Sequence, residues 1–291
     1  RDIGVTGVQT CALPIYELAA MTKNGGGVGV HWNGVRSQGS LIRGNGKSEG
    51  VVPFIKIQDS TTIGVSQGGV RRGASAAYLP VDHGDFWQFI RMRRPEGDQN
   101  RQCLNTHHGV CITDDFIARA KAGDKEAREK WVEILKARFE TGEPYLFFSD
   151  NVSRNRPDCY KERNLDVKGS NICSEIFLHT DEDHSFVCCL SSMNLARWNE
   201  WKDTNAVELA TWFLDGILSE FIVKASKISG FERAVRSAEK GRAIGLGAMG
   251  FHTYLQEHMI PVDSFEAFGL NAQMFSGMQR NALKASTELA K

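Results

Sequence analysis

Residues 170–195 read SNICSEIFLHTDEDHSFVCCLSSMNL and are the most informative segment of the chain. Two apolar runs flank a polar turn at TDEDH, which predicts two segments joined by a loop. In the first run Asn171, Cys173 and Glu175 occupy alternate positions, so an extended backbone would project an amide, a thiol and a carboxyl from one face. The second run adds Cys188 and Cys189. Spacing alone favours ordinary small core residues for these thiols, because free cysteine is often buried and inert.

The segments on either side mix strand and helix patterns. Residues 25–80 hold short apolar runs bounded by glycine, which predict buried strands joined by tight loops: GGGVGVHWNG, SLIRGNG, GVVPFIKI and GVSQGGVRRGASAAYL. Residues 114–139 predict a helix, YLFF at 145–148 a short strand, and the last 25 residues an amphipathic helix. We therefore expect an α/β fold.

A further long helix is expected over residues 205–226. Asn205 and Glu208 have capping-box spacing at its start. A set of apolar positions then falls on one face of the helix: Val207, Ala210, Leu214, Ile217, Leu218 and Phe221.

The composition restricts the class of protein. Hydrophobic residues make up 41% of the 291, and 35 basic residues balance 35 acidic ones. A polyanion-binding protein usually has a basic excess, so nucleic acid is disfavoured as the main ligand. No apolar run approaches the roughly 18–20 residues that span a bilayer, and no signal peptide is evident, so we expect no membrane association. Seven unevenly spaced cysteines suit reduced thiols in the cytoplasm better than a secreted disulfide framework.

The first 15 residues, RDIGVTGVQTCALPI, differ in pattern from the remainder of the chain. They resemble a translated sequencing-adapter read, a common contaminant of assembled sequence. We expect residues 1–15 to be a non-native, adapter-like segment and assign no function to Cys11.

Four segments carry a resemblance to a known family. SNICSEI followed by FVCCLSSMNL is similar to the paired active-site segments of the large (alpha, catalytic) subunits of ribonucleotide reductases. GGGVGVHWNGVRSQGSLIRG resembles the family stretch with the first specificity loop, and GVSQGGVRRGAS resembles the second. GFERAVRSAEKGRAIGLGAMGFHTYL resembles the second half-barrel, so the likeness covers residues 25–291. It implies that residues 16–291 are a partial barrel domain, part of a ten-stranded α/β barrel with a central finger loop.

The resemblance also implies catalytic roles. Cys173 corresponds to the thiyl radical that abstracts the 3′ hydrogen of the ribose, and Glu175 to the base that takes the 3′-hydroxyl proton. Asn171 corresponds to the amide that holds the substrate. Cys188 corresponds to one of the two thiols that reduce the radical intermediate. Because successive side chains of a strand point to opposite faces, Cys189 is expected to face away from the substrate and to be a packing residue.

The implied binding residues fall into two sets. Gly27 aligns with a glycine whose backbone contacts substrate, and a tight strand-end turn would explain it equally well. The whole substrate-binding set is Gly27, Asn171, Ile172, Cys173, Ser174 and Glu175. The residues implied to bind the allosteric effector are Arg36 and Arg43, at its phosphates, and Gln67 and Arg71, in the second loop.

Cofactors and partners follow from the same likeness. The substrate is expected to be a ribonucleotide, specifically a diphosphate, and the effectors deoxynucleoside triphosphates or ATP. No metal or cofactor is expected on this chain. SNICSEI favours class I, with its radical from a metal-containing small subunit, while CCLSSMNLAR also resembles the adenosylcobalamin-dependent class II. Thioredoxin or glutaredoxin would be the reductant, and the parent enzyme would be a cytoplasmic homodimer.

We expect this chain to be a fragment that is inactive by itself. The thiol partner of Cys188, the ATP-cone domain, the radical-transfer tyrosine pair and the C-terminal cysteine pair are expected to lie outside it. Cys11 lies at the wrong distance from Gly27 to be that partner. A non-catalytic nucleotide-binding module on the same scaffold is the alternative, and the presence of Cys173 and Cys188 argues against it, since binding alone needs no redox thiol.

Three further patterns point to other functions only weakly. GLGAMG at 245–250 fits G-x-G-x-x-G, but no clear strand precedes it. His107 and His108 with Cys103 and Cys111 fit no standard zinc spacing and are interpreted as ordinary strand residues. FWQFIRMRR after Asp85 predicts an amphipathic helix with a basic end.

Overall fold

The computed structural model describes residues 7–42, 44, 46–66 and 72–291, without the side chains of residues 7–12. The chain divides into two compact units. Unit 1 contains Arg1–Glu182 and Ser229–Phe231, and unit 2 contains Asp183–Ile228 and Glu232–Lys291.

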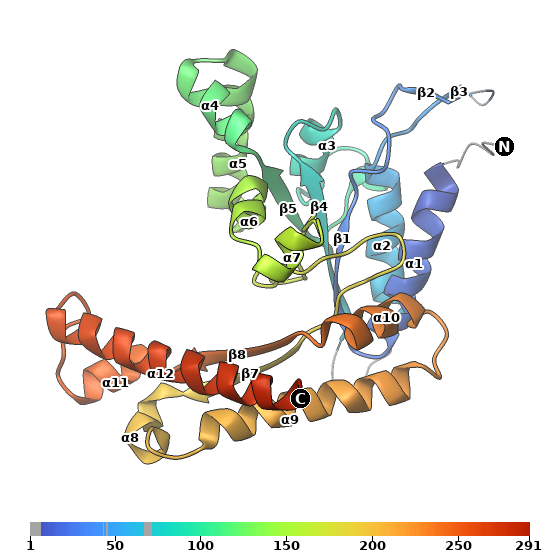
Figure 1. Ribbon diagram of the computed structural model, residues 1–291. Coiled ribbons are helices and arrows are strands. Elements are labelled where there is room, and N and C mark those ends of the chain that lie inside the picture. The colour runs from blue at the N-terminus through green and yellow to red at the C-terminus, as the bar shows by residue number, and fades with distance from the viewer. Residues whose placement is uncertain (1–6, 43, 45, 67–71) are drawn as a thin grey trace. The chain divides into compact units, whose positions relative to one another are not determined.

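Unit 1 is built on a parallel sheet with the strand order β1-β4-β5-β6 (Figure 1). Its strands are β1 (Gly27–His31), β4 (Ala74–Pro80), β5 (His107–Ile112) and β6 (Tyr145–Phe148). Gly27 pairs with Ala74, and Gly109 with Tyr145. A small antiparallel hairpin of β2 (Leu41–Ile42) and β3 (Gly46–Lys47) lies between β1 and β4 in the sequence. The strand predicted at YLFF is confirmed as β6.

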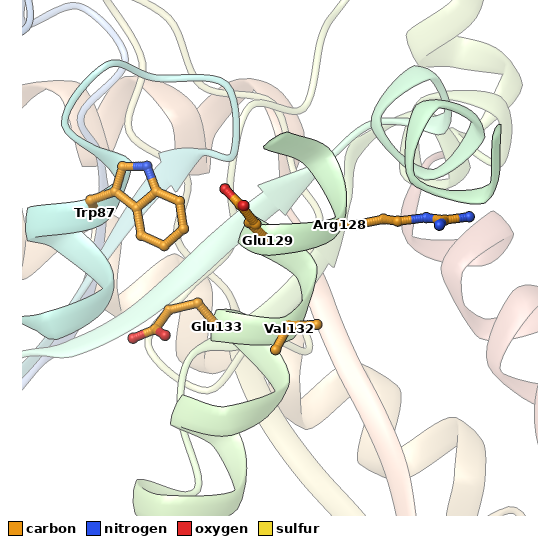
Figure 2. A pocket seen from close by; sticks show the side chains of 5 residues that line it. All are labelled: Trp87, Arg128, Glu129, Val132 and Glu133. Atoms are coloured by element: carbon orange, nitrogen blue, oxygen red, sulfur yellow. The ribbon is translucent and has the colours of Figure 1, made fainter. Parts of the chain in front are cut away.

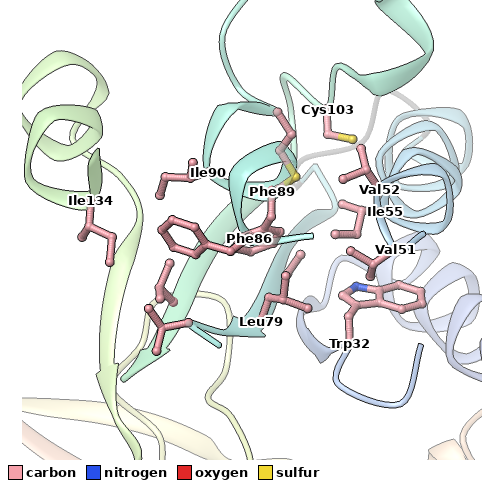
Figure 3. Packing of buried hydrophobic residues seen from close by; sticks show 14 of the residues in the cluster. Trp32, Val51, Val52, Ile55, Leu79, Phe86, Phe89, Ile90, Cys103 and Ile134 are labelled. Atoms are coloured by element: carbon pink, nitrogen blue, oxygen red, sulfur yellow. The ribbon is translucent and has the colours of Figure 1, made fainter. Parts of the chain in front are cut away.

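Helices cover one face of this sheet (Figure 1). They are α1 (Gly7–Lys23), α2 (Val52–Val65), α3 (Phe86–Arg91), α4 (Asp114–Ala122) and α5 (Lys125–Thr141). Figure 3 shows the core between them, where Leu79 of β4 meets Ile55 of α2 and Phe86 and Phe89 of α3. Because strand side chains alternate, Ala76 and Tyr78 of β4 face the other way.

Two sequence predictions in unit 1 were wrong. GVVPFIKI forms the start of helix α2 instead of a strand, and its proline stands in the first turn, where its missing N–H costs no helical hydrogen bond. The single helix expected over 114–139 is two helices. Gly123 has φ +99° and ends α4, and the carboxylate of Asp124 accepts a hydrogen bond from the Ala127 N–H to cap α5. The helix predicted at FWQFIRMRR is confirmed as α3, which ends at Arg91.

After β6 come two short helices, α6 (Ser149–Arg154) and α7 (Asp158–Glu162), and residues 163–188 then form no regular helix or strand. A 3-10 turn, η1 (Gln99–Arg101), follows α3.

Unit 2 has a parallel pair of strands, β7 (Cys189–Asn194) and β8 (Ile244–Met249). Its helical segments are η2 (Leu195–Arg197), α8 (Trp198–Trp201), α9 (Ala206–Ala225), α10 (Glu232–Gly241), α11 (Phe251–Glu257) and α12 (Phe265–Leu289). The buried residues of its core come from the helical segments other than α10: Leu195, Trp198, Val207, Tyr254, Met274 and Met278.

The helices predicted at 205–226 and at the end of the chain are confirmed as α9 and α12, with a correction to the first. The Asn205 side chain makes no cap, and the Thr204 hydroxyl accepts from the Ala206 N–H instead. The buried positions of α9 are Val207, Glu208, Thr211, Leu214, Leu218 and Ala225. Ile217, placed on the buried face from the sequence, is 38% exposed.

The GLGAMG string is not a phosphate-binding turn. Its first five residues lie within strand β8, and only Gly250, with φ +79°, forms the turn into α11. A dinucleotide fingerprint needs its glycines after the strand, so this interpretation fails on position.

Among the described residues, no helix combines the length and apolar character that a membrane span requires.

Candidate active site

The irregular segment after α7 packs on the face of the unit 1 sheet opposite helices α1–α5, together with Val152 of α6 and Tyr160 of α7. Val167 is buried there against Ala76 and Tyr78 of β4 and Phe147 of β6, and Ile172 packs against the same cluster. The predicted catalytic Asn171, Cys173 and Glu175 lie in the middle of the irregular segment 163–188 and are thereby held on the sheet.

The backbone of the loop turns sharply at the predicted site. Residues 172–174 form a turn and a bend, and Ser174 has φ +70°, a left-handed conformation that is uncommon outside glycine. The Asn171 side-chain oxygen accepts hydrogen bonds from the Ser170 hydroxyl (3.1 Å) and from the N–H groups of Glu175 (3.2 Å) and Ile176 (3.1 Å). The extended conformation considered for this segment is therefore wrong, because a local side chain replaces a strand partner.

Two glycines of β1 allow this close approach. A Cβ on Gly27 would lie 2.8 Å from Ile172 Cγ2, and one on Gly29 would lie 3.0 Å from the Asn171 carbonyl carbon. Gly25, with φ +81°, makes the turn before the strand. A side chain at Gly27 would therefore collide with Ile172, and this close packing, not a tight turn, explains the glycine.

The cysteines of unit 1 divide by environment. Cys103 and Cys111 are buried, and burial raises the pKa of each thiol to about 12. Cys173, in contrast, is exposed, as is Glu175 two residues later. The interpretation of Cys173 as an inert core residue is therefore wrong, and a thiol and a carboxyl are presented together on one turn.

A charged cluster borders the same end of the sheet. The Glu143 carboxylate contacts His107 Nδ1 (2.5 Å), His108 Nδ1 (3.0 Å) and Arg93 Nε (3.3 Å). Burial alone would raise the pKa of Glu143, but the hydrogen bonds from both histidines and the charge of Arg93 hold it well below its usual range. Within the described part of the chain, no cluster has a set of side chains suited to a metal ion.

Tyr145 connects this cluster to the turn. Its ring stacks on His107, with centroids 6.1 Å apart and planes 19° apart. Burial raises the pKa of Tyr145, and the nearby charges of Glu143 and Cys173 add to that effect. Tyr145 therefore keeps its phenol proton beside the Glu143 carboxylate.

Cys188 and Cys189 belong to unit 2. Cys189 shares a strand face with Met193, which packs on the unit 2 core, and burial raises the pKa of the Cys189 thiol. Cys188 lies on the opposite face with Leu190, where its sulfur would be 3.5 Å from a Cβ on Gly245. This is the alternation expected from the sequence.

Of the predicted effector residues, only Arg36 can be placed. It is exposed, and its guanidinium donates to the Leu41 carbonyl within its own loop (3.1 Å). Arg43, Gln67 and Arg71 lie outside the described residues. The Asp85 carboxylate accepts from the N–H groups of Gln38 and Val51, both at 2.8 Å, and so joins the two ends of the segment 38–51, which begins two residues after Arg36.

Sequence reasoning missed Tyr78, Gly29 and the Glu143 cluster. Gly29 had a detectable signal, because glycines at 27 and 29 leave one face of a strand without side chains. Tyr78 and Glu143 gave none, since their partners are distant in sequence.

A surface hollow elsewhere in unit 1 is a poorer candidate (Figure 2). It is lined by Trp87 of α3 and by Arg128, Glu129, Val132 and Glu133 of α5. These helices cover the opposite face of the sheet from the turn. The lining offers no thiol.

Comparison with known proteins identifies the scaffold. The sequence matches the family described as "Ribonucleotide reductase, barrel domain" over residues 13–128 and 123–291. A putative ribonucleoside-diphosphate reductase large subunit of Frog virus 3 is 43% identical, with 94% of this chain and 50% of that protein covered. A ribonucleoside-diphosphate reductase large subunit of Arabidopsis thaliana is 30% identical, with all of this chain and 42% of that protein covered.

A solved structure agrees. The class Id ribonucleotide reductase alpha subunit of Actinobacillus ureae is 40% identical, with a TM-score of 0.89 over 99% of this chain and 53% of that one. It is a class I protein, in agreement with the preference for class I. The chain spans about half the length of this structure and of the viral relative. The chain therefore belongs to the ribonucleotide reductase large-subunit family and forms a portion of its barrel domain.

Proposed function

We propose that this chain is part of a class I enzyme that reduces ribonucleoside diphosphates to 2′-deoxyribonucleotides by thiyl-radical chemistry. The observation that supports this most is the exposed Cys173 thiol, two residues from the exposed Glu175, on a turn that is tied to the sheet by the Tyr78 hydrogen bond and by the packing of Ile172. A binding module has no need of such a group, whereas hydrogen abstraction requires a thiol that substrate can reach.

In the proposed reaction, the Cys173 thiyl takes the 3′ hydrogen of the ribose and becomes a thiol. Glu175 takes the 3′-hydroxyl proton, which assists departure of the 2′-hydroxyl as water. Two thiols, of which Cys188 is one, supply two electrons and two protons in all and end as a disulfide. Cys173 then returns its hydrogen to C3′, and the thiyl is restored.

The turn geometry supports a divided role for Asn171 in this proposal. Its side-chain oxygen is occupied by the turn, so its NH₂ group is the part that would donate to a bound substrate. Gly27 and the backbone of residues 172–174 would complete the substrate contact.

The partners in this proposal follow from the family. A metal-containing small subunit supplies the radical, and thioredoxin or glutaredoxin restores the dithiol. Arg36, Arg43, Gln67 and Arg71 contribute to an effector site for deoxynucleoside triphosphates or ATP, in a cytoplasmic homodimer.

Substitution of the proposed radical thiol tests the function. In the full-length protein with its small subunit, Cys173→Ser should abolish turnover. A serine O–H bond is too strong for the substrate radical to take back the hydrogen and regenerate a radical on residue 173. Substrate affinity should change by less than about tenfold, roughly 1.4 kcal/mol, because the side chains are similar in size. Turnover assays and calorimetry with the nucleoside diphosphate measure the two effects.

Cys159→Ser is the matched control, since Cys159 is also exposed but lies on α7. It should retain full activity. Turnover by Cys173→Ser at the wild-type rate would refute the proposed function.

A further inference from the structure

The Tyr78 hydroxyl lies beneath the turn that carries Cys173. Tyr78 is fully buried on β4, and its hydroxyl donates a 2.6 Å hydrogen bond to the Asn171 carbonyl, 93 residues away in sequence. Burial raises the pKa of the phenol, and the hydroxyls of Ser170 and Ser174 lie close enough to lower it by a smaller amount. The phenol therefore keeps its proton and remains a donor at any working pH.

The ring that bears this hydroxyl is held on two sides. A Cβ on Gly109 of the neighbouring strand would lie 2.5 Å from Tyr78 Cε1, so this glycine makes room for the ring. Phe147 of β6 packs against it edge-on, with centroids 6.2 Å apart and planes 66° apart. A ring packed in this way leaves its hydroxyl in one position.

The turn itself needs an external support. Ser174 adopts φ +70°, a conformation that side chains other than glycine rarely take and that persists where the surroundings enforce it. The hydrogen bonds of Asn171 Oδ1 are internal to residues 170–176 and do not join the turn to the sheet. The Tyr78 hydrogen bond does.

We infer that Tyr78 is a positioning residue for the reaction proposed above: its hydroxyl fixes the turn that presents Cys173 and Glu175 to substrate. Tyr78 does not touch the reacting atoms in this assignment. The inference rests on the proposed function for its catalytic consequence, and on the hydrogen bond alone for its structural one.

The test uses Tyr78→Phe in the full-length protein, a change that keeps the packed ring and removes only the donor. Alkylation of each cysteine by iodoacetamide, followed by mass spectrometry, reports on the turn without any need for turnover. Cys173 should react about fivefold faster, because loss of one net hydrogen bond raises the population of molecules whose turn is released from the sheet by about that factor. Exposed Cys159 should keep its rate, and buried Cys103 and Cys111 should stay protected.

Turnover with the small subunit is the second readout. Because misplacement of a reacting group by about 1 Å can cost up to about 100-fold, kcat should fall about 10- to 100-fold, with KM within about twofold. Tyr254→Phe is the matched control: this tyrosine is also buried and its hydroxyl accepts from Asn199 (3.3 Å), but in unit 2. It should leave both Cys173 reactivity and kcat unchanged.

The outcomes separate the two proposals. If the wild-type protein shows no turnover and Tyr78→Phe still speeds Cys173 alkylation, the positioning role is supported and the proposed function is contradicted. Unchanged Cys173 reactivity in Tyr78→Phe would overturn the positioning role, whatever the activity. Exposure of Cys103 or Cys111 along with Cys173 would also overturn it, because the hydroxyl would then support the whole core.

Discussion

His31 illustrates how the loop alters the chemistry of a single side chain. It ends β1, and its Cβ would be 3.5 Å from a Cβ on Gly169 of the loop. Burial, with a smaller effect from the charge of Lys168, lowers the pKa of His31 to about 4. The imidazole is thus neutral under the loop at neutral pH.

This shift predicts an acid-dependent loss of stability. Above the unfolded pKa of about 6.5, His31 is neutral in both states and contributes nothing. Between that pH and about 4 the unfolded chain binds a proton that the folded chain does not, so the free energy of unfolding falls as the pH falls, by up to about 3 kcal/mol. His31→Gln should lose less stability than wild type between pH 7 and 4.5 in urea titrations. Equal losses in the two proteins would contradict the assigned pKa.

Strand β1 shows how one element makes room for another. Val28 and Val30 face the helix core, whereas Gly27 and Gly29 present a face without side chains to the loop. Strand β8 of unit 2 has a similar division of its two faces. Leu246 and Ala248 pack on the core, and Gly245 and Gly247 face the other way. In both sheets, one face is packed by helices and the other carries glycines beside a predicted catalytic segment.

Gly29→Ala should therefore destabilise unit 1. Its Cβ would fall well inside contact distance of the Ser170 carbonyl oxygen, a backbone atom that cannot move without the loop. Overpacking of this kind costs about 1–3 kcal/mol. Chemical denaturation monitored by fluorescence measures the change.

Gly216→Ala is the control, and its change in the free energy of unfolding should have the opposite sign. Gly216 lies inside α9, is exposed, and would carry a Cβ with nothing within 4 Å of it. Alanine there should stabilise the protein by about 0.5–1 kcal/mol, because it reduces the entropy lost on helix formation. A Gly29→Ala variant as stable as wild type would show that the loop does not approach β1 closely in solution.

At the scale of the whole molecule, the charge balance constrains how phosphates can be bound. With 35 basic and 35 acidic residues there is no net charge to attract a polyphosphate, so local arginines must supply the contacts. Arg36 is exposed and lies two residues before the segment 38–51, whose ends Asp85 joins. A guanidinium beside this anchored segment can contact a phosphate with little loss of backbone order.

In the full-length protein, Arg36→Ala and Arg43→Ala should each weaken deoxynucleoside triphosphate binding by roughly 1.5–3 kcal/mol, the range for a charge-assisted contact. Calorimetry measures the affinities. Arg280→Ala removes an exposed arginine from α12 and should have no effect. Unchanged affinity in both loop variants would remove these residues from the effector site.

The predictability of the fold depended on whether a signal was local. Helices α9 and α12 and strand β6 were predictable because their periodicity lies within a few turns of chain. Helix α2 was not, because GVVPFIKI is a short apolar run that fits a buried strand equally well. The break at Gly123 was missed because a glycine inside a helical pattern can be tolerated or can end the helix.

The class of fold, the family likeness and the identity of the residues proposed for catalysis could be predicted from the amino-acid sequence, since these depend on residue type and order along the chain. Tertiary packing was needed to show that Cys173 is exposed while Cys103 and Cys111 are buried, and that the side-chain oxygen of Asn171 is occupied by the turn. It also placed the Tyr78 hydroxyl under Asn171. The physical reason is that burial and hydrogen bonding between segments 93 residues apart arise from packing across a sheet, which no local pattern encodes.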